Sequence, residues 1–310
     1  MVLYVNKDIF KQAGIVNADG SLKYPDTWQE LAEYSQIIKE KTGKAGYVIP
    51  TTNNCGGWQF LNIAWAYGVE FEKQRDDGTW EATFDTQEAR DALQFIKDLK
   101  WKYNAFLDDT VISQDDMYKY FGSGQAAMML REPPFSGYSW GLANEAISCT
   151  KLPKGPAGRF AQMGGNVWMF SKNSTPEQID AGFKWLEFTG FAPEMSAEQE
   201  NNYRTDCETT VENHGVVIER EGFEVWTNPE TLEKRRSIRK EFANVDYNDY
   251  KTYFEADDVT VHLEPAACAQ QLYAILDKCI QEVITNENAD VAKLISEANQ
   301  DFQVNHLDKM

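Results

Sequence analysis

The feature that most constrains the fold is a helix start that recurs along the chain. A capping residue is followed three positions later by an acidic or amide residue and then by apolar residues at helical spacing. The pattern occurs at four places: Thr27 with Glu30, Asp85 with Glu88, Ser113 with Asp116, and Thr175 with Gln178. Each capping side chain accepts a hydrogen bond from backbone N–H groups that a helix start leaves free. The pairs therefore predict where four helices begin.

Short apolar runs lie between these helices and predict strands. They cover residues 1–5, 47–49, 126–130 and 167–170, and Asp77-Gly78 is a hairpin turn. We expect the helix after Thr175 to bury a stripe that includes Phe183 and Trp185. Two further helices carry apolar stripes, one from Leu272 to Val283 and one from Val291 to Phe302. Short strands between capped helices predict the α/β class.

Charge and cysteine content exclude several functions. The formal net charge is −19, so the chain lacks the basic surface that nucleic acid or an anionic membrane would need. No apolar run reaches the roughly 18 residues of a membrane span. Five cysteines without a Cys-x-x-Cys pair, and three dispersed histidines, predict neither a disulfide framework nor a zinc site. We expect no metal and no cofactor.

Four segments in order resemble family 1 of the extracellular solute-binding proteins, the group that includes maltose-binding protein. Residues 3–15 (LYVNKDIFKQAGI) are similar to its crossover strand and helix, and residues 25–31 (PDTWQEL) to its Pro-x-Thr-Trp-x-Glu-Leu helix start. Residues 121–128 (FGSGQAAM) and 152–156 (LPKGP) with Gly164-Gly165-Asn166 continue the series. Each motif alone is weak, but their order and spacing together are specific.

The resemblance implies a type II periplasmic-binding-protein fold, in which two α/β lobes close on a ligand about a hinge. It covers the whole chain but begins inside the family pattern, after the secretion signal and much of the first lobe. We therefore expect a first lobe that is incomplete. The implied divisions are a hinge crossover at 1–7, the second lobe at 8–160, a first-lobe segment at 161–225, and a return to the second lobe at 226–310.

The implied function is capture of a sugar or oligosaccharide for an ABC importer. Its partners would be a carbohydrate and the permease subunits. The full-length protein would be a monomer outside the cell or in the cell envelope. The high aromatic content, with 9 Trp, 14 Tyr and 17 Phe, is compatible with stacking on sugar rings. Another solute, such as a peptide, polyol or amino compound, remains an alternative on the same scaffold.

The first candidate binding loop follows a predicted strand, where α/β sheets bind ligands. Asn54 offers an amide to hydroxyl groups, Gly57 permits close backbone approach, and Trp58 could stack on a ring. The resemblance implies an aromatic ligand contact at about this position. A surface turn, with Trp58 packed into the fold, is the equal alternative.

A second loop follows the strand at 126–130 and offers Arg131, Glu132 and Phe135. An Arg–carboxylate pair can bind adjacent hydroxyls, or the two can neutralise each other. The family often has a Gly-Pro-Trp-like step here, and this chain departs from it. Two further loops contribute Asn166 with Trp168, and Glu264 before the penultimate helix. Core packing is the alternative for Trp168, and a structural role for Glu264.

A glycoside hydrolase is the catalytic alternative, because paired carboxylates also serve that chemistry. The adjacent acidic pairs are Asp76-Asp77, Asp108-Asp109, Asp115-Asp116 and Asp257-Asp258. Such pairs at turns and helix starts are commonly solvated. The sequence has no phosphate loop and no Gly-x-Gly-x-x-Gly fingerprint. We expect no catalytic residues and no enzymatic activity.

Overall fold

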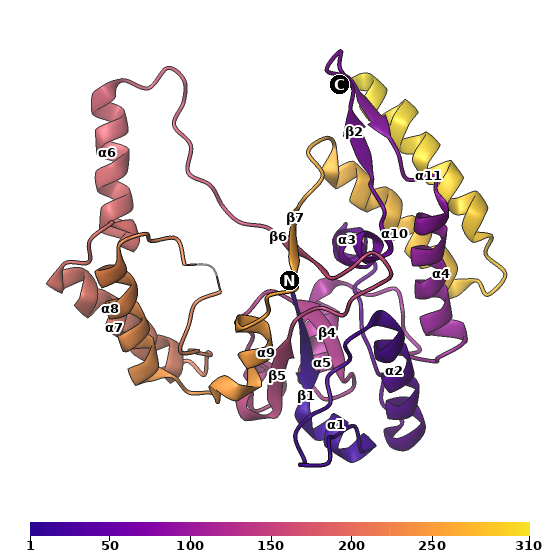
Figure 1. Ribbon diagram of the computed structural model, residues 1–310, viewed down its shortest axis with the longest axis horizontal. Coiled ribbons are helices and arrows are strands. Elements are labelled where there is room, and N and C mark those ends of the chain that lie inside the picture. Colours follow the sequence, from indigo (N-terminus) through magenta and orange to yellow (C-terminus); the bar gives the residue numbers. More distant parts are fainter. Residues whose placement is uncertain (223) are drawn as a thin grey trace.

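The computed structural model describes residues 1–222 and 224–310, which form a large body and a smaller arm (Figure 1). The body holds β1 (Val2–Asn6), α1 (Lys7–Ala13), α2 (Trp28–Thr42), α3 (Cys55–Tyr67), β2 (Glu72–Gln74), β3 (Trp80–Ala82), α4 (Gln87–Trp101), α5 (Gln114–Gly122), β4 (Met128–Arg131), β5 (Ile147–Thr150), β6 (Phe160–Met163), α9 (Lys251–Phe254), β7 (Thr260–Leu263), α10 (Ala269–Thr285) and α11 (Val291–Asn305). The arm, residues 164–246, holds α6 (Pro176–Leu186), a π-helical turn (Glu187–Phe191), α7 (Ala197–Glu212) and α8 (Pro229–Phe242).

Local sequence fixes most helix starts as predicted. Capping boxes form at Thr27 with Glu30, Ser113 with Asp116 and Thr175 with Gln178. The predicted box at Asp85 is wrong by one residue. Thr86 has the extended backbone of a cap and accepts from the Ala89 N–H of α4. The Asp85 carboxylate instead pairs with Arg90 and accepts from the Ser296 hydroxyl at 3.0 Å.

The central sheet has the order β4-β1-β5, with β1 antiparallel to both neighbours. Every residue of β1 is buried. Because successive side chains of a strand point to opposite faces, Leu3 and Val5 enter one core while Val2 and Tyr4 enter a second. The predicted strand at 47–49 contributes only a single bridge, from Val48 to Met129 of β4.

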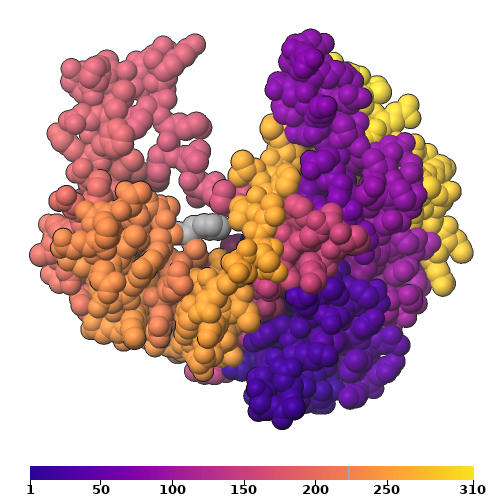
Figure 2. Space-filling model, viewed as in Figure 1, coloured from indigo at the N-terminus to yellow at the C-terminus, as the bar shows by residue number. Residues whose placement is uncertain are grey.

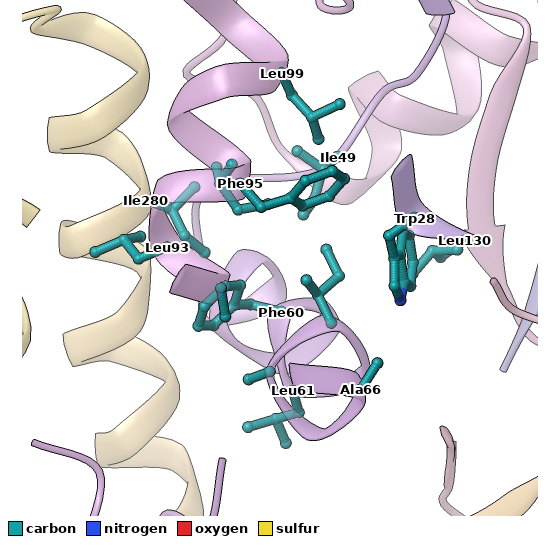
Figure 3. Packing of buried hydrophobic residues seen from close by; sticks show 14 of the residues in the cluster. Trp28, Ile49, Phe60, Leu61, Ala66, Leu93, Phe95, Leu99, Leu130 and Ile280 are labelled. Carbon is teal, nitrogen blue, oxygen red and sulfur yellow. The ribbon is translucent and has the colours of Figure 1, made fainter. Parts of the chain in front are cut away.

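The larger core lies where α3, α4 and α10 meet (Figure 3). Phe60 of α3, Leu93 of α4 and Ile280 of α10 are each at most 1% exposed, and Trp28 at the start of α2 is also buried. Substituting an alanine for one of the buried aliphatic residues should cost about 2–5 kcal/mol of stability. This packing fixes α3 and α10 relative to each other, and the candidate site lies at their junction.

The arm has a small core of its own. This core is formed by Cys207 of α7, Ile238 of α8 and Val217 from the chain between the two helices. The neighbours of Val217, Val216 and Ile218, belong instead to the second core of the body. The α8 helix packs on α7, and the chain regains the body at α9, which lies on β5.

Residues 164–175 cross from β6 to α6 as an extended segment (Figure 1). The strand predicted at 167–170 is wrong, because these residues pair with no other strand among the described ones. The predicted buried stripe of α6 is also wrong: the helix has no buried residue, and Phe183 and Trp185 are exposed. Their aromatic contacts are with this segment, Phe183 against Phe170 and Trp185 against Trp168.

Arg159 connects the start of β6 to two distant parts of the body. Its side chain is 2% exposed and pairs with Asp26 (Nη2–Oδ1 2.5 Å) and Asp258 (Nε–Oδ2 3.1 Å). The guanidinium also donates to the Leu152 carbonyl. Lys154 and then Arg159 hold the pKa of Asp26 below its ordinary value of 3.8. Lys151 and then Arg159 do the same for the pKa of Asp258.

We predict that R159M lowers the free energy of unfolding by roughly 2 kcal/mol at pH 7, the scale of hydrogen bonds to charged groups. The two carboxyl pKa values are lowered in the folded state, so their stabilisation is present above pH 3.8 and is lost as pH falls through the folded values. The difference between wild type and R159M should therefore shrink under acid conditions. Urea unfolding between pH 3 and pH 7 measures it.

The matched control is K154M, because Lys154 binds the same Asp26 from an exposed position. We expect it to cost less than about 1 kcal/mol, as exposed ion pairs do. An equal loss in both variants, or a difference that does not change with pH, would contradict the assignment to the buried guanidinium.

Candidate functional site

Two parallel strands bring the ends of distant segments to one edge. β6 and β7 pair in register, with Gln162 opposite His262 and Met163 opposite Leu263. Glu264 follows β7 directly and leads into α10. Since the carboxyl ends of parallel strands lie at the same edge, Gln162 and Glu264 meet beside the start of α3.

Trp58 joins these residues through its ring nitrogen. Its Nε1 donates to Glu264 Oε1 at 2.9 Å, and Gln162 Nε2 donates to the same oxygen at 3.2 Å. The Gln162 backbone N–H in turn donates to Asn62 Oδ1 at 2.7 Å. We call Trp58, Gln162 and Glu264 the Trp58 cluster. It places an indole ring, an amide and a carboxylate together, a set of groups suited to binding hydroxyl-bearing solutes.

The loop before Trp58 depends on α10. Asn54 has a left-handed backbone and provides no side-chain cap for α3. Asp277 of α10 takes that role, accepting from Asn54 N–H and Gly57 N–H at 2.7 Å each. Burial raises the pKa of the Asp277 carboxyl, and these N–H bonds oppose the rise. The Asn54 amide donates to Gln270 Oε1 at 3.1 Å.

Sequence reasoning selected Asn54, Gly57, Trp58 and Glu264, and the structure brings them to one place. It missed Gln162 and Asp277. Asp277 carries a sequence signal, because it lies beside Leu276 within the apolar stripe of α10 and is buried there. A carboxylate in such a stripe requires hydrogen-bond partners. Gln162 has no comparable signal, since its position depends on the pairing of β6 with β7.

The Arg131 loop is arranged differently from the prediction. The Arg131 guanidinium lies over the Tyr118 ring at 4.2 Å and is 3.7 Å from Glu132. Phe135 is 4% exposed and stacks on Trp140 within the second core. Phe135 is expected from the sequence to contribute to ligand binding, but a ring buried in this way has no face left for a ligand. No hydrogen bond joins Arg131 or Glu132 to the Trp58 cluster in residues 1–222 and 224–310.

Asn166 and Trp168 are exposed on the extended segment. Trp168 is 57% exposed and contacts Trp185 edge to face, with ring centroids 4.8 Å apart. The segment leaves the body beside the cluster, since a Cβ added at Gly164 would lie 3.7 Å from Glu264 Oε1. Asn166 and Trp168 therefore follow the cluster along the chain, and within the described part of the chain neither forms a hydrogen bond with it. Figure 2 shows a hollow between the arm and the body along this course.

A cavity of about 460 Å³ in the arm is a less suitable binding site. Trp226 lines it, but Phe191 stacks on this ring and the Arg235 guanidinium lies 3.7 Å from its centroid. The same guanidinium covers the Tyr203 ring at 3.9 Å. These contacts leave less ring surface for stacking on a ligand.

Several acidic pairs have structural roles. Asp77 accepts from Thr79 in the hairpin turn, Asp116 closes a capping box, and Asp258 pairs with Lys151 and Arg159. Among the residues that the structure describes, no group of three or more His, Cys, Asp or Glu side chains could hold a metal ion. The same part of the chain contains no helix with the length and apolar character of a membrane span.

Comparison with known proteins gives the family and the fold. Residues 1–191 match the family model of bacterial extracellular solute-binding proteins. The sn-glycerol-3-phosphate-binding periplasmic protein UgpB of Shigella flexneri is 32% identical over 215 residues, which are 64% of this chain and 44% of that protein. The arabinooligosaccharide-binding protein of Halalkalibacterium halodurans is 28% identical over 131 residues, 41% of this chain and 26% of that protein. The chain thus spans less than half the length of these relatives.

Two solved structures are similar throughout the chain. Maltose-bound MalE3 of T. maritima has a TM-score of 0.62 at 21% identity, with 97% of this chain and 69% of that chain covered. UgpB from Mycobacterium tuberculosis, in complex with glycerophosphocholine, has a TM-score of 0.63 at 15% identity, covering 98% and 67%. The α/β fold is therefore that of periplasmic binding proteins of the MalE type, as predicted.

Gly57 provides a test of the α3–α10 junction. A Cβ at this position would lie 2.3 Å from the Tyr273 carbonyl oxygen and 2.7 Å from its Cα. Backbone atoms cannot move aside cheaply, so we predict that G57A lowers the free energy of unfolding by about 1–3 kcal/mol. Chemical denaturation measures the change.

The control is G165A, where nothing lies within 4 Å of an added Cβ. It should leave stability within about 0.5 kcal/mol of wild type. If G57A proved as harmless as G165A, the close approach of α3 to α10 would be refuted.

Proposed function

Because the chain belongs to the bacterial extracellular solute-binding proteins, we propose that it takes part in capturing a sugar or oligosaccharide for an ABC importer. The observation that carries this proposal is the Trp58 cluster, in which Trp58 donates to Glu264 at 2.9 Å beside Gln162. The hydrogen bond fixes the indole, and a fixed ring loses little entropy when a sugar packs on it. The cluster would hold its ligand by ring contact and hydroxyl hydrogen bonds.

The charge of the cluster favours an uncharged ligand. UgpB of Shigella flexneri is named for binding sn-glycerol 3-phosphate, and the Halalkalibacterium halodurans relative for binding arabinooligosaccharides. The Glu264 carboxylate accepts the hydrogen bonds from Trp58 and Gln162 and is the ionisable group of the cluster. A carboxylate accepts hydrogen bonds from hydroxyl groups but repels a phosphate. A glycerol phosphate ester is the second candidate, supported by the identity to UgpB.

Membership of the family implies further properties, which we propose for the whole protein. It would bind its ligand without changing it and deliver it to permease subunits, as a monomer outside the cell or in the cell envelope. The structural roles of Asp77, Asp116 and Asp258 support a non-catalytic protein. A glycoside hydrolase needs two carboxyl groups facing one scissile bond, and these three act in turns, caps and ion pairs.

The test is a thermal-shift screen with maltose, laminaribiose, arabinotriose and sn-glycerol 3-phosphate. A saccharide present at 100 times its dissociation constant should stabilise the folded state by about 2.7 kcal/mol. W58A and E264Q should each weaken saccharide binding by about tenfold, or 1.4 kcal/mol, through loss of the ring or of the charged acceptor. Calorimetric titration measures both.

The control is W101A, because Trp101 is 40% exposed on α4 and donates to the Val283 carbonyl away from the cluster. It should bind as wild type does. A shift by sn-glycerol 3-phosphate alone would select the second candidate. Binding unaffected by W58A and E264Q would remove the Trp58 cluster from the site, and cleavage of a labelled glycoside would revive the hydrolase.

A further inference from the structure

We infer that Asp277 is a positioning residue, whose carboxylate sets the orientation of the 54–58 turn for ligand binding. The inference rests on the proposed function, because it assigns a role in that same site. Asp277 is remote from the turn in sequence, lies on α10 and is 5% exposed. Its role follows from the missing cap of α3, for which its carboxylate substitutes.

The α3 helix begins without a cap of its own. Asn53 and Asn54 both have positive φ, 58° and 69°, and the Asn54 side chain makes no capping hydrogen bond. The N–H groups of the first turn would then lack acceptors in a buried setting. Asp277 supplies both oxygens, Oδ2 to Asn54 N–H and Oδ1 to Gly57 N–H, each at 2.7 Å. A carboxylate also suits the positive end of a helix.

The glycines of the turn make this approach possible. A Cβ at Gly56 would lie 2.8 Å from Asp277 Oδ1 and 2.7 Å from the Pro50 carbonyl oxygen. Gly57 faces the backbone of Tyr273, one helical turn before Asp277. Two adjacent residues without side chains thus admit the carboxylate to the helix start.

Two other α10 side chains, on either side of Asp277, bind this turn or the residues just before it. Gln270 Oε1 accepts from the Asn54 amide at 3.1 Å, and Gln281 Nε2 donates to the Thr51 carbonyl at 2.5 Å. Asp277 lies between Gln270 and Gln281 on α10 and accepts from the backbone N–H groups of Asn54 and Gly57. Of these three α10 side chains, Asp277 is the one with two hydrogen bonds to the start of α3.

The bonds of Asp277 bear directly on Trp58. Gly57 N–H is held by Asp277, and the next residue is Trp58, whose indole reaches Glu264. Glu264 precedes α10, so α10 is connected to the turn twice, through Asp277 to Gly57 and through Glu264 to Trp58. A shift of the turn relative to α10 would move the Trp58 ring relative to Glu264. Binding geometry is sensitive to displacements of this kind.

The critical variant is D277N, which keeps the shape of the side chain but replaces one oxygen with an NH2 group. That group would face a backbone N–H, either of Asn54 or of Gly57, so two donors would oppose each other. E282Q removes a carboxylate from the same helix away from the turn. L276A removes a side chain that is 1% exposed in the core, and so lowers stability without altering the acceptors of the turn.

The experiment titrates maltose, laminaribiose and arabinotriose into each variant by calorimetry, well below the melting temperatures. Backbone hydrogen exchange at residues 54–58 is followed in parallel. We expect D277N to bind about tenfold more weakly than wild type, the scale seen when residues that orient a binding group are changed, and to exchange faster at 54–58. E282Q and L276A should bind within about twofold of wild type, although L276A melts at a lower temperature.

Binding by D277N with the wild-type affinity would overturn the inference and leave the proposed function intact. Equal losses in D277N and L276A would also overturn it, since the effect would then be one of stability. If wild type bound none of the three saccharides, the proposed sugar-binding function would fail, and the role of Asp277 in it would fall as well.

Discussion

The close contact between α3 and α10 is the constraint on which both the core and the candidate site depend. Gly57 permits it, because the α10 backbone at Tyr273 occupies the space of a side chain. On one side of the contact, Phe60 and Ile280 pack into the main core. On the other, Asp277 closes the helix start and Trp58 reaches Glu264. The same pair of helices therefore builds the main core and orients the polar groups of the candidate site.

Helix starts could be predicted where the capping residue lies next to the helix. Thr27, Ser113 and Thr175 carry their own box partners three residues later, and each forms the expected bonds. Thr86 shows the limit of the pattern, since two adjacent residues can each cap and tertiary contacts of Asp85 decide between them. The start of α3 could not be read this way, because its acceptor is 220 residues from Gly57 in the sequence.

Predictions that required a partner element were less successful. Residues 167–170 have strand composition, but a strand is defined by its neighbour, and the segment contacts α6 instead. Phe135 is a candidate binding residue because its loop follows a strand, although its ring packs in the second core. The loop at 54–58 is predicted from its position after a strand, and Glu264 from its position before the penultimate helix. Their meeting depends on the register of β6 and β7, which single-sequence patterns do not contain.

Three consecutive residues, Val216 to Ile218, couple the arm to the body in a particular way. Val216 and Ile218 pack in the second core of the body, whereas Val217 packs between α7 and α8. Pulling this run out of either core would expose valine or isoleucine side chains, each contributing about 1.5–3 kcal/mol by burial. The stability of the arm is therefore not independent of that of the body: partial unfolding of one removes part of the interior of the other, and the two cores share a cooperative boundary.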